Sequence, residues 1–498
     1  MIEQPTCSLS LAQLFQQDPT RGHRYAGQVG ELYVNYAKHW ITDDVLQALT
    51  QFAQKHHLSE AIQRLFQGAV VNRSEQLPAL HTELRAQHRG QALQAAHVAL
   101  VHGVEALYQG NWRGSTGRPF RSIIHLGIGG SDVGPRLALE ALAAYRHPKA
   151  PRIHFVSNID GLEWQAAIQA CDPTETLVIL ASKSFQTPET LLNAETARTW
   201  FLGHQLDPAA HWLAITAHPE RAKACGVERI LWMAPSIGGR YSLWSTMGFS
   251  VAVFVGVAGF EALLAGAQVV DEHFAHTILP NNLPALLGLL TVWYRHYHDI
   301  HSHVVLPYTQ ALALLPTYLQ QLDMESCGKS CTQEGNAVSR SGMAVWGQVG
   351  TLAQHTFHQW LHQGTETVLT DFILVAEGHP LGHQTTVLAN ALAQSQALMI
   401  GCPNLDLHRH IPGNRPHTIM VLPKLTPYTL GNLLAFYEHQ VYTQAVCWGI
   451  NPFDQFGVEL GKKLTSVLLP VLAGGDIPAT VDSATGAVIT HLKNILRT

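Results

Sequence analysis

The sequence predicts an α/β protein with two doubly wound parallel sheets and an additional helical region at the N-terminus. Short runs rich in Ile, Val and Leu alternate with helical stretches in two separate parts of the chain. Alternation of this kind implies right-handed βαβ crossovers and parallel sheets covered on both faces. The chain has 498 residues, too many for one ordinary core, so two or three folding units are expected.

The first alternating part contains five apolar runs of the kind that form strands buried on both faces. These runs are residues 122–126, 153–156, 177–181, 213–216 and 230–233. Amphipathic stretches between them, such as 160–170 and 189–201, predict helices that cover this first sheet.

A mainly helical stretch from Ser242 to His298 separates the two alternating parts. Strands are then predicted at 304–307, 368–375 and 418–422, with helices around 311–321, 352–361 and 384–399. We therefore predict four regions: an N-terminal helical region 1–115, α/β domains 116–290 and 291–465, and a C-terminal helical tail 466–498.

The composition predicts a well-packed protein of a reducing compartment. Charged residues make up only 13% of the chain, and the net charge of -5 without a Lys/Arg-rich run argues against a nucleic-acid partner. Seven scattered cysteines indicate reduced thiols, and the N-terminus carries no export signal, so we expect a cytoplasmic location. The uncharged stretch Tyr241–Phe260 has nearly the length of a bilayer span, but its hydroxyls and glycines favour a buried core helix over a membrane helix.

Ligands of doubly wound sheets bind beyond the carboxyl ends of the strands, and two loops there suit an anion. The first strand runs into Gly127–Asp132, where glycines allow a sharp turn and expose N–H groups at a helix start. The third strand ends in Ser182–Glu189, where three hydroxyls and a lysine precede a helix with Pro188 in its first turn. Together these loops predict a phosphate cradle, although each alone also fits a tight turn or a hydroxyl-rich helix cap.

Candidate acid–base groups follow the later strands. Arg240 lies among glycines after the fifth strand and can offer a fork of donors to an oxyanion, or form a surface salt bridge. Asp323 and Glu325 lie near a helix end, where partial burial would raise the pKa of a carboxylate and suit it to act as a base. His355 is expected in the first turn of a helix, which would keep the imidazole neutral.

The segment 453–462 is expected to place Gln455, Glu459 and Lys462 on one helical face. Metal, redox and serine-nucleophile sites are less well supported. The thiols of Cys327 and Cys331 are four residues apart, and no GxSxG elbow is present. Four neighbouring histidines lack a matching carboxylate or cysteine set: His296, His298, His301 and His303. We therefore expect neither metal nor cofactor.

Taken together, these segments resemble the glucose-6-phosphate isomerase family over residues 122–464. The motifs occur in that family's order: GIGGSD, SKSFQTPET, IGGRYS, QQLDMES, GTLAQH, GNRP, YEH and INPFDQFGVELGK. The resemblance implies two sugar-isomerase (SIS-type) domains and reversible isomerisation of glucose 6-phosphate to fructose 6-phosphate, in glycolysis and gluconeogenesis, without a cofactor. It also implies a homodimer with shared active sites, while charge and hydropathy, as above, lead us to expect no nucleic-acid and no membrane partner.

The resemblance further implies a role for each matched residue. Glu325 would move the proton between C2 and C1, and Arg240, with the backbone of Gly239, would stabilise the cis-enediolate. His355, from the neighbouring subunit, would open the sugar ring together with Lys462. The other matched residues would bind the substrate: Ser131, Ser182, Lys183, Ser184 and Thr187 the phosphate, and Glu189, Gln321 and Gln455 the sugar, with Glu189 a candidate to orient His355.

Two further functions stay open at this point. Leu322, Cys327 and Leu352-Ala353 stand where the family usually has Gly, Asn and Asn-Gly, so the sugar pocket could also accept mannose 6-phosphate. A sugar-phosphate-binding regulator would keep the hydroxyl loops and dispense with the base. The joint presence of the four catalytic candidates argues against a regulator.

Overall fold

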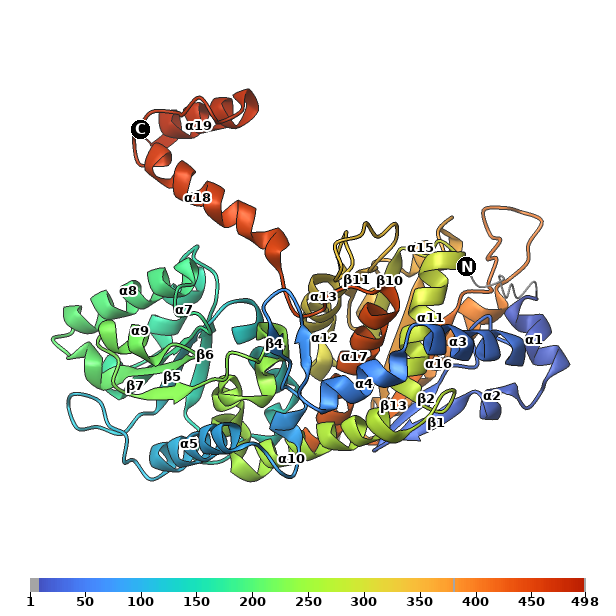
Figure 1. Cartoon of the computed structure of the whole chain (residues 1–498), viewed down its shortest axis with the longest axis horizontal. Helices are drawn as coiled ribbons and strands as arrows, with labels where there is room; N and C mark the ends of the chain where they lie inside the picture. Colours follow the sequence, from blue (N-terminus) through green and yellow to red (C-terminus); the bar gives the residue numbers. More distant parts are fainter. Residues whose placement is uncertain (1–8, 379–380, 497–498) are drawn as a thin grey trace. The chain divides into compact units, whose positions relative to one another are not determined.

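The computed structural model describes residues 9–378 and 381–496, and the chain forms two compact units. The unit Met1–Pro452 contains both sheets, and the unit Phe453–Thr498 is helical. Figure 1 follows the chain through them.

The first sheet has five parallel strands in the order β6-β5-β7-β8-β9. Their bounds match all five predicted runs to within one residue: β5 Ser122–Leu126, β6 Arg152–Val156, β7 Thr176–Ala181, β8 Trp212–Thr216 and β9 Ile230–Trp232. Strands β5, β7 and β8 are buried at every residue, which explains why they contain almost only apolar side chains.

Helices cover both faces of this sheet (Figure 1). On one face α7 (Leu162–Ala170), α8 (Pro188–Gly203) and α9 (Pro219–Ala224) bury their apolar side chains against the strands. On the other face lies α5 (Gln91–Tyr108). The predicted doubly wound arrangement is confirmed for this half.

The second sheet has six strands in the order β1-β2-β13-β12-β10-β11. Four of them are parallel: β10 Ser302–Pro307, β11 Ala344–Gly347, β12 Leu369–Val375 and β13 His417–Leu422. Three were predicted, and β11 was missed. Helices α15 (His358–Gln363) and α16 (Gln384–Ile400) pack on one face of this sheet.

The N-terminal region is mainly helical, but it also supplies strands that the sequence did not predict. The hairpin of β1 (Ala26–Val29) and β2 (Leu32–Asn35) adds to the second sheet, where β2 pairs antiparallel with β13. A smaller hairpin joins β3 (Val70–Asn72) to β4 (Leu77–Pro78). The remaining helices of this region are α1 Leu11–Gln17, α2 Arg21–Arg24, α3 Asp43–Lys55 and α4 Leu58–Phe66.

Three long helices form the central core of the large unit: α10 (Phe249–His276), α11 (Leu283–Tyr297) and α17 (Pro427–Trp448). The segment Thr246–His276, which contains α10, is the one helix in the described residues long and apolar enough to cross a membrane, and 67% of its most apolar window is buried inside the protein. This burial supports the prediction of a core helix for the uncharged stretch.

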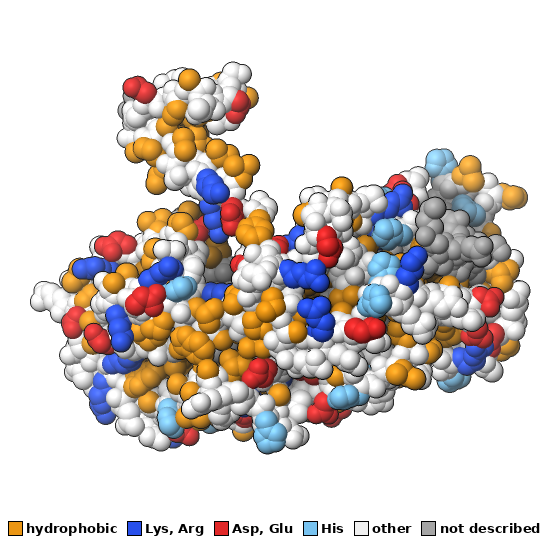
Figure 2. All heavy atoms as spheres, in the orientation of Figure 1, with side chains coloured by type: hydrophobic (Ala, Val, Ile, Leu, Met, Phe, Trp, Pro, Cys, Tyr) orange, Lys and Arg blue, Asp and Glu red, His pale blue; other side chains and the backbone are white. Residues whose placement is uncertain are grey.

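The C-terminal unit contains α18 (Glu459–Leu472) and α19 (Ser483–Leu496). Many of its apolar side chains lie on its surface (Figure 2), among them Leu460 and Leu469, which are 65% and 66% exposed.

Candidate active site

The loops after β5 and β9 meet through glycines. A Cβ added at Gly130 would lie 2.1 Å from the carbonyl carbon of Gly239, so only a residue without a side chain permits this approach. The Ser242 hydroxyl donates to the Gly239 carbonyl at 2.6 Å and to the Gly130 carbonyl at 3.3 Å, and so joins the two loops. The GIGGSD and IGGRYS motifs, far apart in sequence, therefore form one surface.

Gln321 reaches the same surface from the second α/β half. A Cβ at Gly129 would lie 3.0 Å from Gln321 Nε2. Gln321 lies in a single π-helical turn, Gln320–Met324, between α12 (Leu315–Leu319) and α13 (Glu325–Cys327). Such turns are frequent at functional sites, and this one immediately precedes Glu325.

Glu325 and Arg240 lie side by side. Arg240 Nη1 is 3.1 Å from Glu325 Oε2, and the Arg240 side chain is 2% exposed whereas the Glu325 side chain is 25% exposed. Arg240 also donates through Nε to the Ser326 hydroxyl at 2.7 Å and through Nη2 to the Pro452 carbonyl. These bonds hold the guanidinium in one orientation beside a carboxylate that solvent can still reach.

The loop after β7 has the geometry of an anion cradle. The prediction that Pro188 opens the following helix is confirmed, with Thr187 as the N-cap of α8. The Ser182 hydroxyl accepts from the Phe185 N–H at 3.1 Å and lies 3.0 Å from the Thr187 hydroxyl. The Ser184 hydroxyl accepts from the Gln186 N–H at 3.2 Å. This network orients several hydroxyls at the positive end of a long helix.

Two charged side chains, Lys183 in this loop and Glu189 in the first turn of α8, lie beside the cradle. Burial lowers the pKa of Lys183, the nearby Glu75 opposes this effect, and the positive charge of Arg240 adds to it. One carboxylate oxygen of Glu189 is buried without a hydrogen-bond partner among the described residues. A buried carboxylate oxygen without a donor is costly, and a hydroxyl-bearing ligand can satisfy it.

His355 departs from its predicted local structure. The helix α14 spans only Gly350–Ala353, and His355 lies in the turn beyond its C-terminal end, where its backbone N–H donates to the Leu352 carbonyl. The prediction of a first helical turn is therefore wrong. The side chain is exposed and makes no hydrogen bond with the described part of the chain.

Gln455 and Lys462 belong to the C-terminal unit. Gln455 precedes the 3₁₀ turn Phe456–Val458, while Glu459 and Lys462 lie in the first turn of α18. The three residues therefore do not share one continuous helix as expected. All three are exposed in this unit.

Comparisons with known proteins agree with this geometry. A family model described as phosphoglucose isomerase matches residues 35–489. The chain belongs to the phosphoglucose isomerase family. The glucose-6-phosphate isomerase of Burkholderia pseudomallei is 42% identical, over 96% of this chain and 93% of its own, and glucose-6-phosphate isomerase 2 of Chromobacterium violaceum is 39% identical, over 99% and 95%. A solved glucose-6-phosphate isomerase from Chlamydia trachomatis is 31% identical, with a TM-score of 0.88 over 98% of this chain and 96% of its own. The resemblance and the SIS-type fold inferred from sequence are confirmed.

In this family member, a buried ionic cluster supports the turn that carries Arg240. Arg85 bonds both oxygens of Asp271, at 2.5 and 2.8 Å, and pairs with Glu438. Glu438 in turn accepts from the Trp244 indole at 2.8 Å, and the Arg85 guanidinium lies 4.7 Å from the Trp244 ring centroid. Trp244 is the last residue of the 3₁₀ turn Gly239–Trp244, so the cluster anchors the segment that begins at Gly239.

The groups that hold the candidate catalytic side chains could not be identified from the sequence. The Ser326 hydroxyl follows directly after Glu325, but nothing in the sequence indicates that it pairs with Arg240. Glu438, in the YEH motif at 437–439, is the one Asp, Glu, Lys or Arg side chain of α17. A single formal charge in a long helix was the available signal, because such a charge requires a partner when it is buried.

Proposed function

We propose that this chain interconverts glucose 6-phosphate and fructose 6-phosphate through a cis-enediolate. The observation that carries the proposal is the Glu325 carboxylate, 3.1 Å from the Arg240 guanidinium and reachable from solvent. A C–H beside a carbonyl is a poor acid, so the reaction needs a positioned base and a fixed cation for the developing oxyanion. Glu325 is the base, and Arg240 stabilises the enediolate.

Gly239 assists Arg240 through its backbone. It is the first residue of the 3₁₀ turn, and the first N–H groups of a helix have no intrahelical partner. The phosphate is bound by the cradle at the start of α8 and by the adjoining loop: Ser131, Ser182, Lys183, Ser184 and Thr187. Binding at this remote group holds the sugar in reactive geometry. Glu189, Gln321 and Gln455 line the sugar.

Ring opening is assigned to His355 together with Lys462. The exposed His355 side chain serves the site of a second copy, with Glu189 as the group that orients it. The functional form is therefore a homodimer with shared active sites, and the exposed apolar surface of the C-terminal unit supports such an assembly. The substrates are the two sugar phosphates, and the location is cytoplasmic.

The test is a coupled assay on the purified chain. Fructose 6-phosphate is supplied, and NADPH produced by added glucose-6-phosphate dehydrogenase is followed. In Glu325→Gln we expect kcat to fall by roughly 10²–10⁴-fold, the usual contribution of a general base, while the Kd for fructose 6-phosphate changes little. Glu228→Gln, the same change at an exposed carboxylate without an ion pair, is the matched control. An inactive wild type, or an unchanged kcat in Glu325→Gln, would contradict the proposal.

A further inference from the structure

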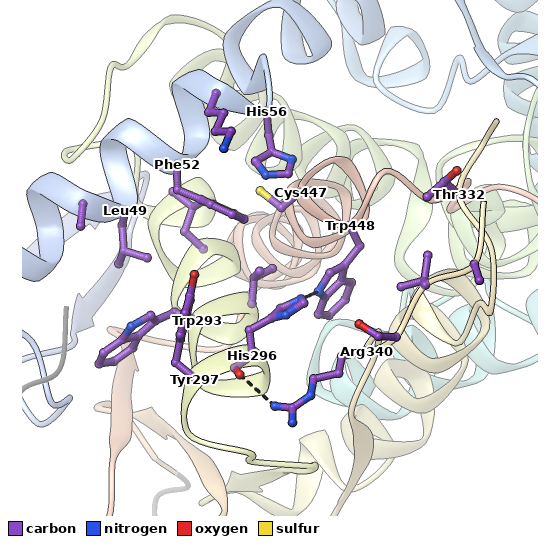
Figure 3. Close-up of a pocket in the computed structure, with 17 residues that line it drawn as sticks. Leu49, Phe52, His56, Trp293, His296, Tyr297, Thr332, Arg340, Cys447 and Trp448 are labelled. Carbon is purple, nitrogen blue, oxygen red and sulfur yellow. Dashed lines mark hydrogen bonds between the residues drawn. The ribbon is translucent and has the colours of Figure 1, made fainter. Parts of the chain in front are cut away.

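A preformed pocket lies apart from the catalytic residues of the large unit. It has a volume of about 340 Å³ and is enclosed by α3, α11, the end of α17 and the loop 332–340 (Figure 3). None of the residues assigned to the isomerase site lines it. Its size lies within the range of small-molecule sites, most of which are concave, largely apolar and lined by a few convergent polar groups.

The walls of this pocket are mainly aromatic and aliphatic. Leu49 and Phe52 come from α3, Trp293 from α11 and Trp448 from the end of α17, and Figure 3 shows their side chains around the cavity. The His56 ring packs on Phe52 with 4.2 Å between centroids. Flat aromatic walls favour a planar apolar ligand. They disfavour a sugar, whose hydroxyls would lose their hydrogen bonds to water.

The charged groups that line the pocket are all cationic: Lys55 and Arg340, with no Asp or Glu among the lining residues. Lys55 is exposed and has no hydrogen bond or ion pair with the described residues. Arg340 is already paired, because Asp299, which does not line the pocket, lies 3.2 Å from its guanidinium. The uncompensated positive charge of the pocket is therefore that of Lys55, at the C-terminal end of α3.

Two further groups supply polar contacts at fixed positions. The Trp448 indole donates to His296 Nε2 at 2.9 Å, so the proton of the neutral imidazole lies on Nδ1, which can donate to a ligand. Arg340 donates to the His296 carbonyl at 2.8 Å (Figure 3), which fixes the guanidinium at the rim. A cation and imidazole groups thus converge on an apolar cavity.

We propose that this pocket binds a small aromatic carboxylate, with its ring between the aromatic walls and its carboxylate near Lys55. The aromatic ring of such a ligand would pack against the aromatic side chains that line the pocket. Its single negative charge would complement the positive charge of Lys55. The site is separate from that of the sugar phosphate. The inference goes beyond the isomerase activity and does not depend on it.

Isothermal titration of the full-length chain with 3-phenylpropionate tests this inference. We expect saturable one-to-one binding, at least roughly tenfold weaker for the uncharged 3-phenylpropanol and for Lys55→Gln, the effect of losing one charged hydrogen bond. Lys223→Gln, at an exposed lysine without an ion pair, should bind as the wild type does. Leu49→Trp fills the cavity and should abolish binding, while isomerase activity reports that this variant is folded.

Three results would overturn the proposal. The first is the lack of saturable binding at millimolar 3-phenylpropionate. The second is equal affinity in the wild type, Lys55→Gln and Leu49→Trp, because the ligand would then bind elsewhere. The third is displacement of 3-phenylpropionate by saturating fructose 6-phosphate, because the anion would then occupy the isomerase site.

Discussion

At the scale of single residues, the contacts of Arg240 explain why the cation proposed to stabilise the enediolate is an arginine. Its three nitrogens reach three different acceptors: the Ser326 hydroxyl, the Glu325 carboxylate and the Pro452 carbonyl. A planar guanidinium offers donors in fixed directions, whereas the ammonium of a lysine is a compact charge on a flexible stem. Charge alone therefore does not reproduce this arrangement.

Arg240→Lys keeps the positive charge and removes the planar set of N–H donors. We expect kcat/KM to fall by roughly 10²–10³-fold, the cost of losing one preorganised donor to a developing oxyanion, with most of the loss in kcat. Steady-state kinetics with fructose 6-phosphate measures the effect. Arg229→Lys, at a partly buried arginine that also donates to a backbone carbonyl, is the control and should retain near wild-type kcat. A loss confined to KM would assign Arg240 to substrate binding only.

The motifs of the sequence indicated which charged residues belong together, but not their surroundings. Arg240 lies among glycines after β9 and Glu325 lies at a helix junction, and the structure brings these two candidates together. The local structure of His355 was predicted wrongly, because one helix was expected over residues 352–361 where the chain forms two short helices and a turn. The bond from Arg240 to Pro452 spans 212 positions, and no local pattern could indicate it.

At the scale of elements, the site depends on two glycine loops packed backbone to backbone. The approach of Gly130 to Gly239 sets the position of the turn that begins with Gly239 and Arg240. The five strands behind these loops were predictable because each contains a short, mainly apolar run, and three of them, β5, β7 and β8, are buried at every residue. The hairpin β1–β2 was not, because its strands are four residues long, partly exposed and weakly apolar.

Gly130→Ala tests the packing of these loops. Its Cβ would lie 2.1 Å from the Gly239 carbonyl carbon, so the loops must separate, and a displacement of about 1 Å at a catalytic group can cost roughly 10²-fold in rate. We expect kcat/KM to fall by about that factor in the coupled assay. Gly203→Ala introduces the same methyl group where no heavy atom lies within 4 Å, and it should leave activity unchanged. Equal kcat/KM in both variants would show that the loops can move apart without loss of activity.

Arg85→Met tests the ionic cluster that joins α10 to α17. Removing the cation leaves Asp271 and Glu438 buried without their charge partner, which costs about 3–5 kcal/mol of unfolding free energy. The expected result is a clearly lower urea midpoint. Arg121→Met, at an arginine that is 76% exposed and 3.4 Å from Glu175, should shift the midpoint little, since such exposed pairs contribute about 0–1 kcal/mol. Similar midpoints for both variants would contradict a stabilising role of Arg85.

At the scale of the whole molecule, the residues proposed for one reaction are distributed over parts with different surroundings. Glu325 and Arg240 lie in the large unit and Lys462 in the C-terminal unit, while His355 is exposed. We proposed that a second copy completes the site, because His355 and the apolar side chains of the C-terminal unit are exposed in one copy. Two-fold symmetry then requires that each site receives the same residue from its partner.

Heterodimers made from two defective chains test this sharing. A Glu325→Gln chain and a His355→Ala chain are co-expressed with different tags and purified through both. If His355 acts in the neighbouring site, one of the two sites has both groups intact, so about half of the wild-type kcat per dimer is expected. Pairing a wild-type chain with a chain that carries both changes gives the opposite result, because every site then lacks one group. If each site used its own His355, the first heterodimer would be inactive and the second would keep about half of the activity. The two arrangements therefore give opposite results in the same pair of proteins.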